Sequence, residues 1–535
     1  MAPRIRALLR TAYVALGATS IYLTWLLAPF VSRTHSAVYH WSGRASDLFL
    51  PPTIDFCAVW LLLTVAFLMA RGPGWVRRVV WGATIAFTPC MALKNWAYVM
   101  GTQFRPTIGL SLFCAGLAFF LIFLLLRGHG CDVRFERIVN GVSTFFLFAG
   151  LSGIIVLGEV AWYGLQTSSL NPAITLHRVQ DRPAHGDKSR IFWIVFDELS
   201  YAQVYERRFE GLQLPAFDAL AGQATVFTHT IPAGILTDRV LPALMTGRPV
   251  NAIRASSDSR RLSLHNSVTG VWESFDEHNT VFEDALQMNY GTAVAGWYHP
   301  YCRILPEVLD HCFWTYSNPT ENSLFPRMSF RSNLATPLIQ FVGGRLGHRV
   351  VSLFHEVPEF TRINAEQHIF DYEALAEATD RILDDRSAGF VMIHLPVPHP
   401  GGIYDRRAER MVTNHSTYVD NLALTDKFLG HVRAKLEKRG EWDSSAVVLM
   451  GDHSWRLGAF EREPRGLVEE ERIASLGGKF DDRPAYVVKL PNQRTSTLID
   501  EPFAALNTRG LLDALFSQKI RSGEDLSAWV KQTGN

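Results

Sequence analysis

The feature that most constrains the fold of this chain is a series of long apolar runs in its first third. Each run has about the 17–25 residues that a helix needs to cross a lipid bilayer. A soluble core built from such helices would need polar helices around it, and this part of the sequence has none. We therefore predict five transmembrane helices, at Thr11–Val31, Thr53–Met69, Val79–Val99, Ile108–Leu126 and Val142–Gly164.

Arginine residues gather in alternate connections between these runs, which indicates how the helices are oriented. They are Arg4, Arg6 and Arg10 before the first run, Arg71, Arg77 and Arg78 before the third, and Arg127, Arg134 and Arg137 before the fifth. Because basic loops favour the cytoplasm, we expect a cytoplasmic N-terminus and an exported remainder. The chain is thus expected to be a multi-pass protein of the bacterial inner membrane, with the lipid bilayer as a partner and a periplasmic C-terminal part.

The length of 535 residues exceeds one ordinary domain, so at least two units are expected. We expect a transmembrane domain at 1–165, a polar, proline-containing linker at 166–189 and an extracytoplasmic catalytic domain at 190–535. The net charge of +1 gives no global electrostatic basis for binding nucleic acid.

Two cysteines, Cys302 and Cys312, are the only pair in the exported part. A disulfide between them fits an oxidising compartment. Two unrelated free thiols are the alternative, and the bridge is favoured.

The exported part alternates short β-rich runs with segments of helical periodicity. The runs "IFWIVF", "TAVAGW", "GFVMIHL", "AVVLMG" and "AYVVKL" predict strands, and "TVFEDALQMN" and "STYVDNLALTDKFLGHVRAKLEKRG" predict helices. This alternation favours an α/β domain with a mostly parallel sheet and helices on both faces, after an all-α bundle of five membrane helices.

Several of the predicted strands end in reactive side chains. "IFWIVF" is followed by Asp197 and Glu198, and "AVVLMG" by Asp452 and His453. "GFVMIHL" continues to His399, and "TAVAGW" leads to His299, whereas His394 lies within its strand as a core residue. Ligands bind beyond the carboxyl ends of parallel strands, so these endings indicate a metal-centred active site.

The residue types at these ends suit one divalent metal ion. Asp197, Asp452 and His453 offer two carboxylates and one imidazole, a set that fits Zn²⁺ or Mn²⁺ best, with Ca²⁺ or Mg²⁺ as alternatives. A hydroxyl nucleophile can fill the open position, and Thr237 in "GILTDRVLPALMTGRPV" is the candidate. Threonine before a helix is more often only an N-cap, and one residue can serve as both. Glu198 either reaches the metal or pairs with Arg239.

The ordered motifs resemble the alkaline phosphatase superfamily, in particular its sulfatase-like branch. They are "IFWIVFDE", "GILTDRVLPALMTGRP", "TVFEDALQMNYGTAVAGWYH", "FVMIHLPVPHP" and "AVVLMGDHSWRLG", and they span roughly residues 190–495. The resemblance implies that Asp197, Asp452 and His453 bind metal and that Thr237 is the nucleophile.

The resemblance also implies substrate contacts and two departures from the family pattern. His399 resembles the contact with the substrate anion, and His299 resembles the histidine of the family's "GKWH"-like strand end. Sulfatases require Cys or Ser in C/S-x-P-x-R, which is oxidised to formylglycine, whereas this chain has Thr237-Asp238-Arg239. No histidine follows the "DH" pair in the sequence, which favours one metal ion, with His399, His299, Arg239 and Arg456 handling the charge of the substrate.

Membrane helices before such a domain resemble the lipid A phosphoethanolamine transferases and lipoteichoic acid synthases. This similarity implies a membrane phospholipid donor and an envelope glycan or lipid acceptor. The resulting prediction is a metal-dependent phosphotransferase or phosphodiesterase of the cell envelope that works through a threonine nucleophile. The alternatives are a sulfatase-like hydrolase of phosphate or sulfate esters and a non-catalytic scaffold for envelope assembly. A scaffold would have no need of the intact set of site residues.

Overall fold

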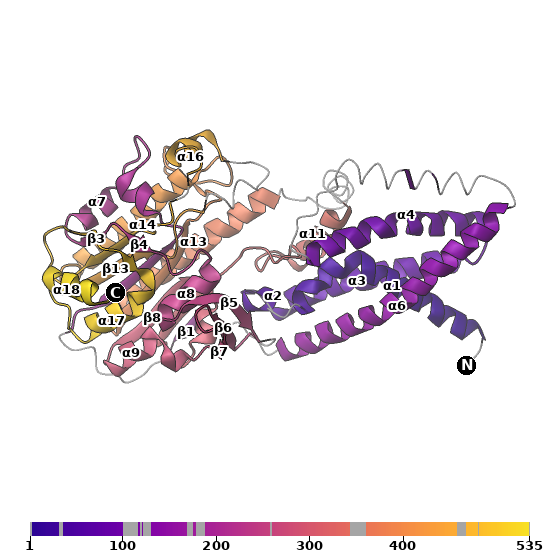
Figure 1. Cartoon of the computed structure of the whole chain (residues 1–535), viewed down its shortest axis with the longest axis horizontal. Coiled ribbons are helices and arrows are strands. Elements are labelled where there is room, and N and C mark those ends of the chain that lie inside the picture. The colour runs from indigo at the N-terminus through magenta and orange to yellow at the C-terminus, as the bar shows by residue number, and fades with distance from the viewer. Residues whose placement is uncertain are drawn as a thin grey trace. The chain divides into compact units, whose positions relative to one another are not determined.

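The computed structural model of the chain forms two compact units (Figure 1). It describes residues 3–31, 36–99, 116–117, 120, 130–167, 175–177, 188–256, 259–342, 360–456, 467–479 and 481–533. The first unit comprises Met1–Val38, Gly43–Leu170 and Pro319–Val357, and the second comprises Tyr39–Ser42, Asn171–Asn318 and Pro358–Asn535. Tyr39–Ser42 therefore belongs to the second unit, although the residues on both sides of it belong to the first. Pro319–Val357 belongs to the first unit, although the residues on both sides of it belong to the second.

The first unit is helical. Its helices are α1 (Pro3–Val31), α3 (Ala45–Met69), α4 (Gly74–Val99), α6 (Gly130–Thr167) and α11 (Phe330–Val342), while the short α2 (Ser36–Tyr39) leads into the second unit. Helix α1 packs against α3, α4 and α6, and α11 packs against α3. Trp60 of α3 donates its indole N–H to the carbonyl of Ala12 in α1 at 2.7 Å.

Three helices in the described part of the chain are long and apolar enough to cross a membrane, over Pro3–Phe30, Ala45–Met69 and Val133–Gln166. They cover the second and fifth predicted runs, and the first run except for its last residue. The third run, Val79–Val99, is helical in α4 but is not among these three. The fourth, Ile108–Leu126, lies almost wholly outside the described residues.

The second unit is built on a nine-stranded sheet, in the order β1-β9-β8-β10-β2-β13-β14-β3-β15. The central strands β9, β8, β10, β2 and β13 are parallel, whereas β1 and β14 run antiparallel to their neighbours. The prediction of a mostly parallel sheet is confirmed. The strands are β1 (Thr175–His177), β2 (Ile191–Asp197), β3 (Thr225–Phe227), β8 (Gly291–Trp297), β9 (His311–Thr315), β10 (Ala388–Pro398), β13 (Ala446–Gly451), β14 (Tyr486–Lys489) and β15 (Thr497–Ile499).

Helices cover both faces of this sheet (Figure 1). Alternate residues of β2 supply the two cores: Trp193 and Val195 belong to one, and Ile194 and Phe196 to the other. Both faces of a central parallel strand are buried, which explains why the strand is apolar without alternation. The first core holds α8 (Thr237–Thr246), α9 (Val281–Gln287), α10 (Tyr301–Ile304), α17 (Thr508–Phe516) and α18 (Gly523–Thr533), and the second holds α7 (Pro215–Ala221), α13 (Phe360–Asp384), α14 (Tyr418–Lys438) and α16 (Glu469–Ala474).

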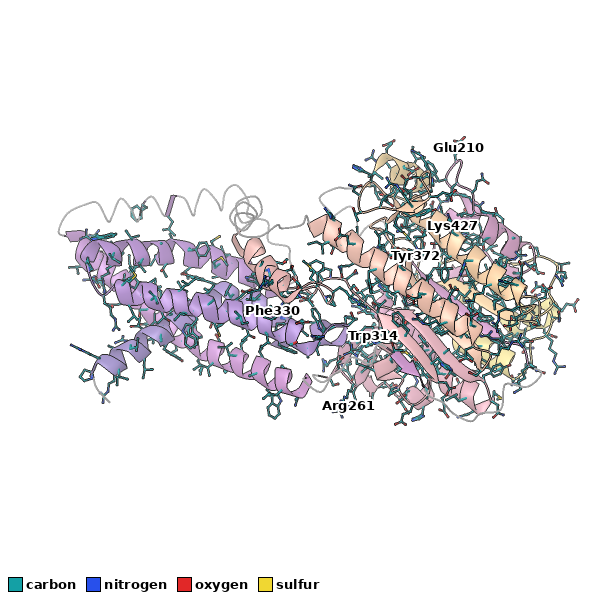
Figure 2. The ribbon with its side chains drawn as sticks, turned by 180° about the vertical axis from the view of Figure 1, so that it is seen from behind. Glu210, Arg261, Trp314, Phe330, Tyr372 and Lys427 are labelled. Atoms are coloured by element: carbon teal, nitrogen blue, oxygen red, sulfur yellow. A yellow bond between two sulfur atoms is a disulfide. The ribbon has the colours of Figure 1, made fainter. Side chains whose placement is uncertain are left out.

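Both helices predicted from the sequence for this unit are present. Helix α14 begins after Thr417, which forms a reciprocal capping box with Asp420, and Gly440 follows its end with a φ of 70°. Figure 2 shows Lys427 on this helix and Tyr372 on α13.

The remaining described elements are short. They are the strand group β5 (Val250–Ala255), β6 (Leu262–Asn266) and β7 (Trp272–Ser274), the pairs β11 (Tyr404–Asp405) with β12 (Arg410–Met411) and β4 (Thr230–Ile231) with β16 (Phe503–Ala504), and the single turns η1 (Ala202–Glu206), η2 (Glu277–Asn279) and η3 (Ala505–Asn507).

Candidate metal centre

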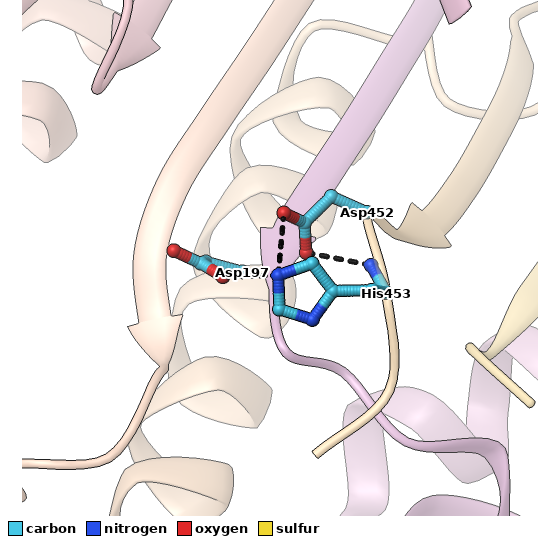
Figure 3. Close-up of side chains that lie close together, drawn as sticks. All are labelled: Asp197, Asp452 and His453. Carbon is cyan, nitrogen blue, oxygen red and sulfur yellow. Dashed lines mark hydrogen bonds and ion pairs between the residues drawn. The ribbon is translucent and has the colours of Figure 1, made fainter. Parts of the chain in front are cut away.

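Two neighbouring strands bring three potential metal ligands together (Figure 3). Asp197 ends β2, and Asp452 and His453 follow β13, so the parallel pairing of the strands fixes their proximity. One ligand atom from each residue lies within 4.8 Å of the others, and all three side chains are buried. The Nε2 atom of His453 is 3.3 Å from Asp452 Oδ2 and 3.6 Å from Asp197 Oδ1.

The imidazole of His453 is held in the tautomer that ligates a metal through Nε2. Its Nδ1 lies 3.0 Å from the carbonyl oxygen of Ser454, which can only accept a hydrogen bond. When the ring is neutral, its proton therefore lies on Nδ1, and the lone pair on Nε2 faces the two carboxylates. A backbone carbonyl commonly orients metal-binding histidines in this way.

The two aspartates differ in how their oxygens are satisfied. Asp452 Oδ1 accepts the backbone N–H groups of Glu198 at 3.0 Å and His453 at 2.7 Å. Asp452 Oδ2 and both oxygens of Asp197 have no hydrogen-bond partner among the described residues. Buried carboxylate oxygens without donors are costly, and a cation beside them would remove that cost. The donor set thus fits a divalent metal ion.

Burial and charge shift the pKa values of the two carboxyls in opposite directions. Burial and then the negative charge of Asp452 raise the pKa of Asp197. Burial also acts to raise the pKa of Asp452, but the imidazoles of His453 and His394 outweigh it and hold that pKa below its usual value. Without a cation the pair therefore favours one proton on Asp197, which is the expected behaviour of two close carboxylates.

Thr237 lies beside the cluster, at the start of α8. Its hydroxyl oxygen is 3.3 Å from Nε2 of His453, and the residue is 4 % exposed. The expectation that Thr237 caps the helix is wrong. Leu236 occupies the N-cap position, its carbonyl accepts the N–H groups of Arg239 and Val240, and no side chain caps the helix. The hydroxyl of Thr237 is therefore not engaged in capping.

His299 contacts the backbone of Thr237. Its Nε2 is 3.2 Å from the Thr237 carbonyl oxygen, and its Nδ1 is 2.9 Å from the hydroxyl of Tyr39. Burial lowers the pKa of His299 to about 3, so the ring is neutral. Both ring nitrogens are occupied in this arrangement.

A buried carboxylate holds the strand end that leads to His299. Asp371 of α13 accepts hydrogen bonds from the indole of Trp297 at 3.0 Å, from Thr315 at 2.7 Å, and from Ser317 through its N–H and its hydroxyl. Tyr298 follows with a φ of 75°, which is uncommon for a residue other than glycine. The end of β8 is thus tied to α13 and β9 before the chain turns toward His299.

The arginines near the cluster pair with acidic side chains. Glu198 accepts from Arg456 Nε at 2.8 Å and from its backbone N–H at 3.0 Å. Of the two roles considered for Glu198, the structure therefore gives an ion pair, and the partner is Arg456 and not Arg239. Arg239 lies 3.6 Å from the carboxylate of Asp238, and its side chain is more exposed than that of Arg456.

Two further histidines lie on or beyond β10. His399 contacts the Pro400 carbonyl through Nδ1 at 2.7 Å, and its Nε2 is 3.7 Å from Glu198. Burial and then the charge of Arg456 lower the pKa of His399. His394 is buried within the strand, and its Nδ1 is 2.9 Å from the Trp297 carbonyl, as expected for a core residue.

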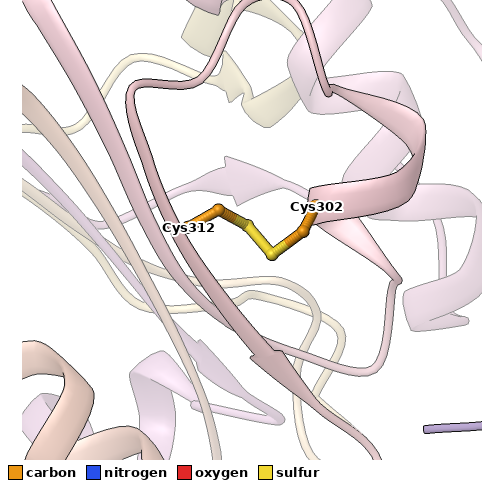
Figure 4. The surroundings of a disulfide bond; sticks show 2 residues. All are labelled: Cys302 and Cys312. Carbon is orange, nitrogen blue, oxygen red and sulfur yellow. A yellow bond between two sulfur atoms is a disulfide. The ribbon is translucent and has the colours of Figure 1, made fainter. Parts of the chain in front are cut away.

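Cys302 and Cys312 form a disulfide that joins α10 to β9 (Figure 4). The next residue, Arg303, is buried, and its guanidinium lies 4.8 Å from the centre of the Trp314 ring. Neither Arg303 nor Tyr39 was predicted to take part in the site. The aromatic cluster "VYHWSG" between two apolar runs is the signal that could have pointed to Tyr39.

A second acidic and histidine group, Glu277, His278 and Glu307, also brings ligand atoms within 4.8 Å of one another. It is half-exposed to exposed, and His278 is already paired with Glu283 and Glu307. Buried carboxylate oxygens without donors, which mark the Asp197 cluster, are not found there.

Comparison with known proteins identifies one matching family, described as Sulfatase, over residues 189–491, which is more than half of the chain. Solved structures to which the chain is similar include Ps i-CgsB in complex with k-i-k-neocarrahexaose (18 % identity, TM-score 0.39, covering 63 % of this chain and 74 % of that one). Others are the phosphonate monoester hydrolase of Agrobacterium radiobacter (13 %, TM-score 0.35, 61 % and 74 %) and the lipoteichoic acid synthase LtaP from Listeria monocytogenes (14 %, TM-score 0.36, 64 % and 74 %). No curated protein matches the chain.

Proposed function

Because the chain belongs to the sulfatase family of the alkaline phosphatase superfamily, and has helices able to span a membrane, we propose that it is a membrane-anchored enzyme. The proposed enzyme is a metal-dependent phosphotransferase or phosphodiesterase of the cell envelope, with Thr237 as the nucleophile. The observation that carries the proposal is the Thr237 hydroxyl, which lies 3.3 Å from the ligating nitrogen of His453 and does not cap its helix.

Asp197, Asp452 and Nε2 of His453 would hold the metal, with Zn²⁺ or Mn²⁺ as the best fit to their donor atoms. When bound, the metal supplies Lewis acidity that lowers the pKa of the threonine hydroxyl and stabilises charge on the transferred group. The carbonyl of Ser454 keeps the lone pair of His453 Nε2 available for this role.

In the first step, the oxygen of Thr237 forms a bond to phosphorus while the bond from phosphorus to the leaving oxygen breaks. The proton lost by the threonine hydroxyl passes to the leaving oxygen. In the second step, an acceptor alcohol or water attacks phosphorus, the bond to Thr237 breaks, and the acceptor's proton returns to threonine. We assign His399 and Arg239 to contacts with the substrate, with His399 as the proton carrier, and we assign Arg456 to positioning through Glu198.

Phosphoryl transfer is favoured over sulfate-ester hydrolysis by the identity of the nucleophile. The usual sulfatase reaction needs a formylglycine made from cysteine or serine, and Thr237 cannot be converted into one. A phospholipid of the membrane as donor, and an envelope glycan or lipid as acceptor, suit a domain tethered by membrane helices, because tethering raises its effective concentration at the lipid. A periplasmic location for the domain follows from the arginine distribution.

The test uses the full chain in nanodiscs loaded with Zn²⁺ or Mn²⁺ and given head-group-labelled phospholipid. We expect label on the peptide containing Thr237 and its loss on addition of acceptor, with no turnover by Thr237→Ala. The matched control is Thr246→Ala in the same helix, whose hydroxyl bonds only to backbone carbonyls of its own helix, and which should remain active. Turnover by Thr237→Ala, or faster cleavage of a sulfate ester than of a phosphodiester, would overturn the proposal.

A further inference from the structure

Four residues between the first two predicted membrane spans belong to the unit that contains the metal-binding cluster. They are Tyr39–Ser42, and the residues on both sides of them in sequence belong to the other unit. Tyr39, Trp41 and Ser42 are buried. We call these four residues the insertion segment.

The second unit holds the insertion segment through its backbone. Arg303 donates hydrogen bonds from Nη2 to the carbonyl of Tyr39 at 2.7 Å and to that of Trp41 at 3.2 Å, and from Nη1 to Ser259 at 2.9 Å. At the other end, Ser42 donates to the carbonyl of Tyr316 at 2.8 Å. Arg303 is itself fixed by the neighbouring disulfide and by the ring of Trp314, which Figure 2 labels.

The side chain of Tyr39 reaches the proposed nucleophile through one intermediate residue. The carbonyl oxygen of Thr237 can only accept, so Nε2 of His299 donates to it. In a neutral ring Nδ1 then carries a lone pair, and it accepts the hydroxyl proton of Tyr39 at 2.9 Å. The hydroxyl of Tyr39 thus selects the tautomer and the ring orientation that let His299 hold the backbone of Thr237.

We propose that Tyr39 is a positioning residue for catalysis, which acts through His299 on the backbone of Thr237. This inference rests on the proposed function in which Thr237 is the nucleophile. It means that a residue between two membrane-spanning helices is a working part of the site in the exported domain. His299 then serves to place the nucleophile, not to contact the substrate.

Removal of the Tyr39 hydroxyl has a defined consequence. Tyr39→Phe keeps the ring and its packing, but leaves Nδ1 of His299 buried without a donor. The ring can then take the other tautomer or rotate, and either change releases the Thr237 carbonyl. A displacement of about 1 Å in a reacting group costs up to roughly 100-fold in rate.

The test compares Tyr39→Phe with Tyr486→Phe in the full chain in nanodiscs, using the phosphodiester bis(4-nitrophenyl) phosphate. Tyr486 is the matched control because it is buried in the same unit and its hydroxyl pairs with Thr508 at 3.1 Å, away from His299. We expect similar small decreases in Tm for both variants. We expect kcat to fall about 10- to 100-fold for Tyr39→Phe alone, with KM changed less than about twofold, because positioning acts on the reacting geometry.

A double-mutant cycle separates positioning from general destabilisation. If Tyr39 acts through His299, then Tyr39→Phe on a His299→Gln background should lower kcat by less than about twofold further. Equal activity of Tyr39→Phe and Tyr486→Phe, or additive effects in the cycle, would overturn the inference. Thr237→Ala is measured alongside: if it remains active the proposed function fails, whereas an inactive Thr237→Ala with a fully active Tyr39→Phe refutes only the role of Tyr39.

Discussion

The paired carboxylates of the candidate metal centre predict an unusual result for Asp197→Asn. This variant should be more stable than the wild type without metal, and metal should no longer stabilise it. Asp197 and Asp452 are buried, with ligand atoms within 4.8 Å of each other. At an effective dielectric constant of about 20, two unit charges at that distance repel by roughly 3.5 kcal/mol. A proton on Asp197 relieves part of this, so we expect the metal-free variant to be more stable by about 1–2 kcal/mol.

The sign of the effect depends on pH. Burial and the charge of Asp452 raise the pKa of Asp197, so the folded chain binds a proton there that the unfolded chain has released. The contribution of Asp197 to the stability of the wild type is therefore fully present below its pKa in the unfolded chain. This contribution is lost as the pH rises through its pKa in the folded chain. The advantage of Asp197→Asn should vanish in acid and be largest at neutral pH and above.

Metal should reverse the order of the two proteins. Free metal at 100 times its Kd stabilises the wild type by about 2.7 kcal/mol. For a unit on the order of 330 residues, which unfolds with about 2.1 cal/mol/K per residue, this raises Tm by about 4 °C. The amide of the variant cannot supply the second carboxylate, so its Tm should move by less than about 1 °C.

The assay is thermal unfolding of the full chain in detergent, with chelator and with Zn²⁺ or Mn²⁺, across a pH series. Glu277→Gln is the control, because it makes the same change in the exposed group of Glu277, His278 and Glu307 and should leave the metal response intact. The reasoning is refuted if Asp197→Asn keeps the full metal-induced increase in Tm, or if it is less stable than the wild type without metal at neutral pH.

Two further predictions concern the disulfide and an acidic pair remote from the metal centre. Replacement of both Cys302 and Cys312 by serine opens a loop with a sequence separation of 10 and should destabilise the second unit by about 3 kcal/mol. Unchanged urea unfolding would contradict this loss of stability. The replacement should also lower kcat, because Arg303 adjoins the bridge. Burial and then the charge of Asp284 raise the pKa of Asp513 to about 7, so wild-type stability should fall as pH rises from about 4 to 7, whereas Asp513→Asn should show a flatter profile. Parallel Tm profiles for the wild type and this variant would count against it.

Much of the fold was predictable because its signals are local. The strands that carry Asp197 and Asp452 are continuous apolar runs, which is typical of buried parallel strands, and their carboxyl ends meet at one edge of a sheet. The bridge between Cys302 and Cys312 was favoured because these are the only two cysteines in the part of the chain that was expected to be exported.

The contacts that complete the site were not predictable, because they join distant parts of the chain. Glu198 lies 258 positions from Arg456, and the nearer Arg239 was as reasonable a partner from sequence alone. The cap assigned to Thr237 was wrong because helix boundaries read from sequence are uncertain by a residue or more. That difference decided whether the hydroxyl faces its own backbone or His453.

The insertion segment also has a consequence for how the protein is made. Tyr39 and its partner His299 are 260 residues apart in the chain. At about 5–20 residues per second, the ribosome supplies the partner roughly 13–50 s after the tyrosine. Tyr39 must therefore wait for its partner throughout that interval. A gene cut at the linker would yield a C-terminal product that lacks this tyrosine permanently, however well the product folds.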